Sequence, residues 1–259
     1  MMTERITEQR SPVPGRRGRL ALAVLDDLVE RVVGGSLLPG SLFPTESELG
    51  QRYAVSRTVI RESMRSLAEK GLVEIRQGQG TTVAPAERWN LLDPVVLDAA
   101  IRHDETLSIL DDLLVVRDSL ESQMAADAAL RRTDGELAEL RLVLTTLASE
   151  IDDPDRYVVD DVLFHDLVMK MSGNALAKSV VSVIHVHARE SLRYTVPEAR
   201  YIAQTQADHE RVYEAIAARD PERARTAMHE HIVGSWLRRR RSNTVRYFGV
   251  SELSGGAAT

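Results

Sequence analysis

The chain has 259 residues, of which 43% are hydrophobic, so it is long enough for two domains that each have a core. It contains no cysteine, which excludes disulfides and thiolate metal sites, and no apolar run reaches the roughly 20 residues of a membrane span. Because no hydrophobic signal segment follows Met1 either, we expect a soluble, cytoplasmic protein with no membrane partner.

The net charge of −6 is divided unevenly along the chain. Residues 1–85 carry 12 basic and 10 acidic residues, a net charge of +2. Residues 86–259 carry 21 basic and 29 acidic residues, a net charge of −8. An acidic domain repels phosphate, so a nucleic-acid-binding face would have to lie in the N-terminal part.

The N-terminal segment begins with an unstructured stretch and continues as a helix. Residues 1–19 are polar, rich in proline and glycine and without periodicity, which predicts a disordered arm. From Leu20 to Val33 apolar residues recur at helical spacing, and Gly34-Gly35 ends this predicted helix.

The stretch from Leu37 to Val83 predicts two short helices separated by a tight turn. Thr45 with Glu48 three residues later is typical of a capped helix start, and Ser56 is a second capping candidate. Apolar residues repeat at helical spacing after each of these positions. Two short helices joined in this way form a helix-turn-helix.

Two short strands follow the second helix. Residues 73–76 and 81–83 alternate in the manner of strands, and Gln77-Gly78-Gln79-Gly80 between them predicts a tight turn. This hairpin is a β-wing, whose glycines allow the backbone to approach a nucleic-acid groove closely.

The polar face of the second helix is the candidate DNA-contacting surface. Arg57, Thr58 and Arg61 lie outside its apolar stripe, in the turns that enter the major groove in this motif. An arginine there can bind the edge of a guanine or a phosphate. The alternative is an ordinary solvated helix face.

The whole stretch resembles the winged-helix DNA-binding domain of the GntR family of bacterial transcription regulators. The matching residues are Leu38-Pro39-Gly40, Pro44-Thr45-Glu46, Glu48-Leu49, Val55-Ser56-Arg57-Thr58, Val59, Arg61-Glu62, Leu67, Gly71-Leu72-Val73 and Gly78-Gln79-Gly80-Thr81. The resemblance implies that Arg57, Thr58 and Arg61 contact double-stranded operator DNA. It also places Gln77 and Gly78 at the wing tip. Ser47 stands where many relatives carry an arginine that contacts a base.

After residue 84 the sequence predicts helices only. Residues 85–93 indicate a linker, and helical blocks follow at roughly 94–102, 106–131, 134–150, 154–172, 175–195, 198–219 and 221–240. The predicted fold is therefore mainly α. It has an N-terminal winged helix-turn-helix with a small β-wing over 20–84, a C-terminal all-α bundle of about seven helices over 94–241, and a flexible tail over 242–259.

Three of the predicted helices carry polar groups on faces that are otherwise apolar. Asp161 and His165 lie one turn apart, and His209 and His231 lie on two later helices. A carboxylate and three imidazoles in one core are costly unless something binds them, and a divalent metal ion such as zinc or nickel suits this donor set. Each histidine could instead be a hydrogen-bonded core residue, and spacing alone leaves both interpretations open.

The same pattern resembles the metal-binding FCD domain, the C-terminal effector-sensing domain of the FadR subfamily of GntR regulators. Asp161-x3-His165 is followed by His209 after 44 residues (165 to 209) and by His231 after 22 more (209 to 231). Further matches are Arg117-x3-Glu121, Ala125-Ala126, Phe164, Ser172-Gly173-Asn174, Ala215-Ile216, Asp220-Pro221 and Met228. The resemblance implies that Asp161, His165, His209 and His231 hold the metal in a domain that binds a small effector.

Two further residues are candidates for contacting that effector. Arg117 lies on the apolar face of its predicted helix, so its permanent charge points into the bundle. Its partner is either Glu121, one turn later, or the carboxylate of a ligand that also binds the metal. His187 also shares an apolar face and is the second candidate, with a hydrogen-bonded core histidine as the alternative.

These features predict a homodimeric transcription regulator, a repressor, whose operator affinity is controlled by a small organic acid at a metal site. The segment Trp89-Asn90-Leu91-Leu92-Asp93-Pro94 resembles that of sugar-acid regulators, so a sugar acid such as a hexonate is the first candidate effector. One alternative is a metalloenzyme that uses the Asp/His3 site, and another is a regulator that senses the metal itself. With no general base near the donors, and no catalytic task for the N-terminal half, we expect no enzyme.

Overall fold

A computed structural model describes the backbone of residues 15–76, 78, 80–190 and 199–247. The side chains of residues 187–190, 199–200 and 241–247 lie outside this description. The chain divides into two compact units, residues 1–99 and 100–259, which are described separately. No helix in the described part of the chain is both long and apolar enough to cross a membrane.

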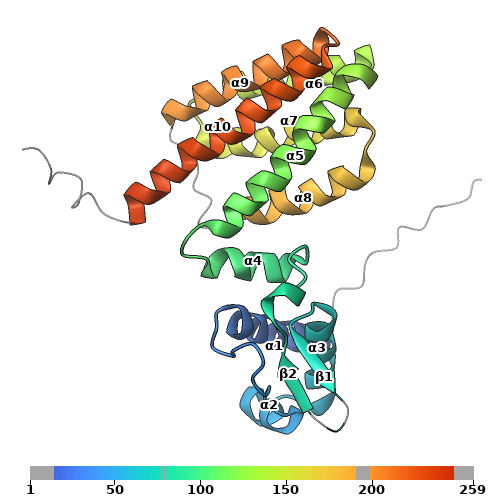
Figure 1. Ribbon diagram of the computed structural model, residues 1–259, viewed down its shortest axis with the longest axis vertical. Coiled ribbons are helices and arrows are strands. Elements are labelled where there is room, and N and C mark those ends of the chain that lie inside the picture. The colour runs from blue at the N-terminus through green and yellow to red at the C-terminus, as the bar shows by residue number, and fades with distance from the viewer. Residues whose placement is uncertain (1–14, 77, 79, 191–198, 248–259) are drawn as a thin grey trace, which may run out of the picture. The chain divides into compact units, whose positions relative to one another are not determined.

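The first unit is a three-helix core with a hairpin. It contains α1 (Arg16–Val33), α2 (Glu46–Tyr53) and α3 (Arg57–Glu69), which surround one apolar core beside the two strands (Figure 1). The predicted capping of α2 is confirmed, because Thr45 Oγ1 accepts from the amide of Glu48 while the Glu48 carboxylate accepts from the amide of Thr45. Helix α1 begins at Arg16, so residues 16–19 belong to this helix and not to the predicted arm.

The hairpin has the expected form of a wing. Strands β1 (Val73–Arg76) and β2 (Gly80–Val83) pair antiparallel, with Val73 opposite Val83 and Arg76 opposite Gly80. Gly78 and Gly80 have φ angles of 78° and 89°, a left-handed conformation that glycine adopts without strain. The sequence therefore placed the turn correctly, while Gln77 itself lies outside the described residues.

The segment predicted as a linker is ordered against the first unit. A short 3-10 helix, η1 (Ala86–Arg88), follows β2, and the Trp89 indole donates a hydrogen bond to the carbonyl of Ala84. Lys70 Nζ lies 2.5 Å from the Asp93 carboxylate, and both side chains are largely buried. These contacts fix residues 85–93 on the winged-helix unit.

Seven helices make up the rest of the described chain. They are α4 (Pro94–His103), α5 (Ser108–Arg131), α6 (Asp134–Ser149), α7 (Pro154–Ser172), α8 (Ala175–Glu190), α9 (Ala199–Ala217) and α10 (Pro221–Tyr247). The boundary between the units falls inside α4, after Ala99, and α10 continues to Tyr247, beyond residue 241 where we had expected the helical domain to end. The mainly α fold with a β-wing is thus confirmed.

The helical unit is organised around the long helices α5 and α10, which pack against each other. Helix α5 packs against α7 and α10, and α9 packs against α10 (Figure 1). Their facing surfaces form a core of alanine, leucine, valine and methionine side chains, into which Phe164 and Tyr157 of α7 are fully buried. Buried polar side chains, among them Glu121, His165, His185, His209 and His231, gather within this core where α5, α7, α8, α9 and α10 meet.

Candidate functional site

The four residues predicted to bind metal come together in the helical unit. Helix α7 supplies Asp161 and His165, α9 supplies His209 and α10 supplies His231. One donor atom from each residue lies within 4.8 Å of the others. All three histidines are at least 97% buried, so these imidazoles share a site that is closed to bulk water.

The spacing of the donor atoms suits one cation. Nε2 of His165 lies 3.1 Å from Nε2 of His231, and Nε2 of His209 lies 3.3 Å from Oδ1 of Asp161. Neighbouring ligands at 2.0–2.2 Å from one metal ion are separated by about 3.0–3.5 Å. The four side chains therefore need little movement to take positions around a single ion.

Unsatisfied atoms also indicate that something is bound among these side chains. Nε2 of His209 is buried and has no hydrogen bond of good geometry in the described structure, despite its approach to Asp161. A buried ring nitrogen without a partner costs about 1–3 kcal/mol. A divalent cation would bind this lone pair, and the residues present fit such an ion.

The electrostatics of the site favour the protonation states of metal ligands. Burial lowers the pKa of His209 to about 4, and burial together with His209 and His165 holds the pKa of His231 well below its usual range. Burial alone would raise the pKa of Asp161, but the adjacent His209 and His165 outweigh it and lower that pKa. These directions favour an ionised Asp161 and neutral imidazoles at His209 and His231 near neutral pH, as metal coordination requires.

Two of the imidazoles have a close neighbour at their other ring nitrogen. The Tyr157 hydroxyl lies 3.3 Å from Nδ1 of His209, and Oε2 of Glu121 lies 2.6 Å from Nδ1 of His165. Nδ1 of His231 is 4.0 Å from the buried carboxylate of Asp208, too far for a hydrogen bond. Such outer contacts orient metal-binding histidines and select their tautomer.

The lowered pKa of His209 predicts that the metal-free protein loses stability in mild acid. The unfolded chain binds a proton near pH 6.5, whereas folded His209 resists it until about pH 4, so the free energy of unfolding falls as pH decreases through this window. The His209 contribution is about 3 kcal/mol at most. Urea unfolding of the metal-free proteins at pH 7 and pH 4.5 should show a smaller loss of unfolding free energy in His209→Gln than in the wild type. An equal loss in both proteins would contradict the lowered pKa of His209.

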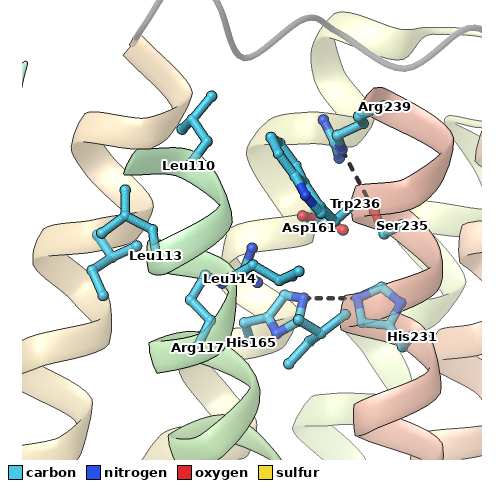
Figure 2. A pocket seen from close by; sticks show the side chains of 12 residues that line it. Leu110, Leu113, Leu114, Arg117, Asp161, His165, His231, Ser235, Trp236 and Arg239 are labelled. Atoms are coloured by element: carbon cyan, nitrogen blue, oxygen red, sulfur yellow. Dashed lines mark hydrogen bonds between the residues drawn. The ribbon is translucent and has the colours of Figure 1, made fainter. Parts of the chain in front are cut away.

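A cavity opens beside three of the four donor residues (Figure 2). It is lined by Asp161, His165 and His231, by apolar side chains of α5, and by Arg117, Ser235, Trp236 and Arg239. Its volume is about 30 Å³, which is enough for roughly two water molecules. The predicted effector residue Arg117 therefore lies in the same cavity as the candidate metal ligands.

Arg117 also has the intrahelical partner that we considered from the sequence. Its Nε lies 2.7 Å from Oε1 of Glu121, one turn along α5. Both interpretations of Arg117 are thus compatible with its position, because it pairs with Glu121 and lines the cavity. The side chain of His187, the other effector candidate, lies outside the described residues.

The sequence analysis missed His185. Its ring is 95% buried, and Nε2 lies 3.1 Å from Oε1 of Glu121. The fully buried side chains of α8 include Val181 and Ile184, next to His185, so the face of α8 that turns to the core includes His185. The signal available in the sequence was Val181, an apolar residue four positions before His185 and therefore on the same helix face.

Arg238, Arg239 and Arg240, near the end of α10, are turned partly inward. Arg239 is 6% exposed and lines the cavity, where its Nε lies 3.5 Å from Ser235 Oγ (Figure 2). Arg238 lies 2.8 Å from the Asp208 carboxylate, and Arg240 pairs with Asp111. Since α10 continues to Tyr247, these arginines lie within the helix and face neighbouring elements.

The predicted DNA-contacting residues are on the surface of the first unit. Arg57 and Thr58 lie exposed in the first turn of α3, and Ser47 is exposed at the start of α2. Arg61 is exposed as well, with its Nε 2.9 Å from the Glu46 carboxylate. Gly78 is exposed at the wing. All are accessible, as contact with DNA requires.

Comparison with known proteins agrees with this two-part organisation. Residues 20–83 match the family described as bacterial regulatory proteins, gntR family, and residues 112–234 match the FCD domain. The galactonate operon transcriptional repressor of Escherichia coli is 30% identical over 212 residues, which cover 82% of this chain and 93% of the repressor. The regulator LutR of Bacillus subtilis is 27% identical over 206 residues, covering 78% and 92% of the two chains.

Among solved structures, the fold is similar to that of Lar, a protein that is described as controlling the expression of the Listeria monocytogenes agr system and mediating virulence. That comparison has a TM-score of 0.57 and 16% identity, and it covers 89% of this chain and 99% of the other. The relatives are transcription regulators, which excludes the metalloenzyme alternative. The chain therefore belongs to the GntR family of bacterial DNA-binding transcription regulators, with the FadR-type architecture in which a winged helix-turn-helix is joined to an FCD domain.

Proposed function

We propose that this regulator is a homodimeric repressor whose operator affinity is controlled by a small organic acid bound at a divalent metal ion. The observation that carries the proposal is one cavity lined by the guanidinium of Arg117 and by donors of the candidate metal centre. An organic anion in this cavity would meet a metal on one side and a guanidinium on the other. Both interactions are charge-assisted, and such pairs bind carboxylates strongly.

The relatives suggest the chemical class of the effector. One of them is named for the galactonate operon, which supports a sugar acid or a related hydroxy acid as the ligand. A hexonate is much larger than roughly two water molecules, which is what the cavity of about 30 Å³ has room for. The ligand would therefore bind a wider arrangement of the helices more tightly than the arrangement described here. A ligand that binds one of two arrangements more tightly shifts the population of molecules toward it.

A dimer would let the short helix α3 recognise a long operator, because each subunit would contribute one copy of the helix. Two α3 helices related by a twofold axis would read two halves of a palindromic operator. The exposed residues Arg57, Thr58 and Arg61 of α3, with Ser47 and the wing tip at Gln77 and Gly78, are the proposed DNA contacts.

Zinc and nickel both suit the three imidazoles and one carboxylate of the proposed metal centre.

A metal-sensing regulator is the second candidate, because four donors are enough to coordinate a tetrahedral ion without an organic ligand. The two functions differ in what releases the operator. A gel-shift assay with metal-loaded protein separates them: the proposed function requires release by an organic acid at constant metal. Release by metal addition or chelation alone, with no effect of any acid, favours the sensor.

The DNA assignment predicts that Arg57→Ala weakens operator binding by roughly 1–3 kcal/mol, because it removes a contact to a base edge or a phosphate. Arg65→Ala is the matched control, since Arg65 lies further along the same helix and pairs with Glu69. Fluorescence anisotropy on an operator fragment selected from random DNA measures both. Equal affinities for wild type and Arg57→Ala would reject the proposed role of Arg57.

A further inference from the structure

A single carboxylate links the candidate metal centre to the arginine of the cavity. Glu121 of α5 is 99% buried in the helical unit. Oε1 lies 2.7 Å from Nε of Arg117 and 3.1 Å from Nε2 of His185. Oε2 lies 2.6 Å from Nδ1 of His165, although the angles of this contact are not those of a hydrogen bond. Both oxygens of one side chain are thus shared among three cationic or polar partners from α5, α7 and α8.

The Arg117 guanidinium offsets much of the cost of burying this carboxylate. Burial alone would raise the pKa of Glu121, but the positive charge of Arg117 and the adjacent His165 and His185 hold it well below its usual range. An ionised carboxylate is an acceptor only. Because Oε2 lies 2.6 Å from Nδ1 of His165, Glu121 favours the tautomer with its proton on Nδ1 and leaves Nε2, the atom that faces His231, free to bind a metal.

A second metal ion among Glu121, His165 and His185 is a weaker explanation of the same cluster. Their donor atoms also lie within 4.8 Å of one another. However, Arg117 already places a fixed positive charge 2.7 Å from Oε1, and a cation beside it would meet like charge. His165 would also have to bind a metal through each ring nitrogen.

We infer that Glu121 is a positioning residue for both halves of the site: it orients His165 for the metal and holds Arg117 at the wall of the cavity. The inference rests on the metal centre of the proposed function and extends it. It assigns a task to a residue outside the four donors. It also means that metal and organic anion act on two partners of the same carboxylate, so the occupancy of one site affects the other.

Metal titration tests this inference, with Co²⁺ as the probe. Glu121→Gln keeps the size of the side chain but replaces one acceptor oxygen with an NH2 donor, so the amide no longer accepts from both sides. We expect the Co²⁺ dissociation constant to rise roughly 10- to 100-fold and the visible absorption of bound Co²⁺ to change. The matched control is Asp118→Asn, three residues earlier on α5, because Asp118 pairs with the exposed His229 at 2.8 Å and away from the cavity. This control should bind Co²⁺ like the wild type.

A purely structural role for Glu121 gives a different result. Glu121→Gln would then unfold at a lower temperature yet bind Co²⁺ with wild-type affinity and spectrum, and this outcome overturns the inference alone. Wild-type protein that binds no Co²⁺ overturns the proposed metal centre together with the inference. If Glu121→Gln does not fold, nitrogen NMR of the metal-loaded wild type decides: a proton on Nδ1 of His165 supports the assignment, and a proton on Nε2 overturns it.

Discussion

Arg117→Ala is expected to abolish release of the operator by the organic acid while leaving metal content and operator binding intact. The substitution removes a charge-assisted contact to the ligand, worth about 1.5–3 kcal/mol, which weakens effector binding roughly 10- to 150-fold. Glu121 keeps its contacts with His165 and His185, so the metal centre retains its outer partner. Calorimetric titration of the effector into the metal-loaded variant measures this loss directly.

Two variants show whether the loss belongs to the guanidinium in the cavity. Arg117→Lys should restore the response only in part, because an ammonium group cannot form the two parallel hydrogen bonds of a guanidinium. Arg225→Ala should respond like the wild type, since Arg225 lies on the exposed side of α10 with Gln123 and Glu222 as partners. Wild-type effector affinity in Arg117→Ala would remove Arg117 from the binding site.

His209→Ala is expected to lower metal content and to remove most of the stability that the metal supplies. When the free metal concentration is 100 times the dissociation constant, metal binding raises the free energy of unfolding by about 2.7 kcal/mol. The variant lacks one of the four ligands and should lose most of this gain. Thermal unfolding with and without added metal isolates this gain from the cost of the cavity that alanine leaves. Elemental analysis gives the stoichiometry.

His229→Ala is the control for this experiment. His229 lies two residues from His231 on the same helix, but its side chain is exposed and pairs with Asp118 on the surface. We expect wild-type metal content and an unchanged metal-dependent rise in melting temperature. A full complement of metal in His209→Ala would contradict the proposed ligand set.

Local rules in the sequence were sufficient to predict most of the fold. Thr133 with Glu136 caps α6 in both directions, as Thr45 with Glu48 caps α2. Asp153 caps α7 and a proline occupies the first position of that helix. Such signals depend on residues three or four apart, so they are visible without tertiary structure.

The four candidate metal ligands were predicted for a similar reason. Helical period places Asp161 and His165 on one face, and the apolar neighbours of His209 and His231 indicate faces that turn toward the core. The structure brings these four residues together, and their binding of an ion stays a prediction. Their convergence follows from packing that the sequence suggested only through resemblance.

The remaining parts of the site depend on contacts that periodicity does not reveal. Apolar residues surround α5 on several sides in its first half, so the sequence did not show that Glu121 turns inward to meet α7 and α8. The basic run near Arg239 suits a solvated helix end by charge alone. Its burial follows from the continuation of α10 past this run and from its packing against α5 and α9.

Operator binding measured by fluorescence anisotropy, with metal-loaded protein titrated by a panel of sugar acids and other hydroxy acids, tests the central claim most directly. The proposed function predicts that at least one acid releases the operator, and that removing the metal with a chelator or replacing Arg117 with alanine abolishes this release. Operator affinity that no acid changes, or an acid response of equal size in metal-free protein, would contradict it.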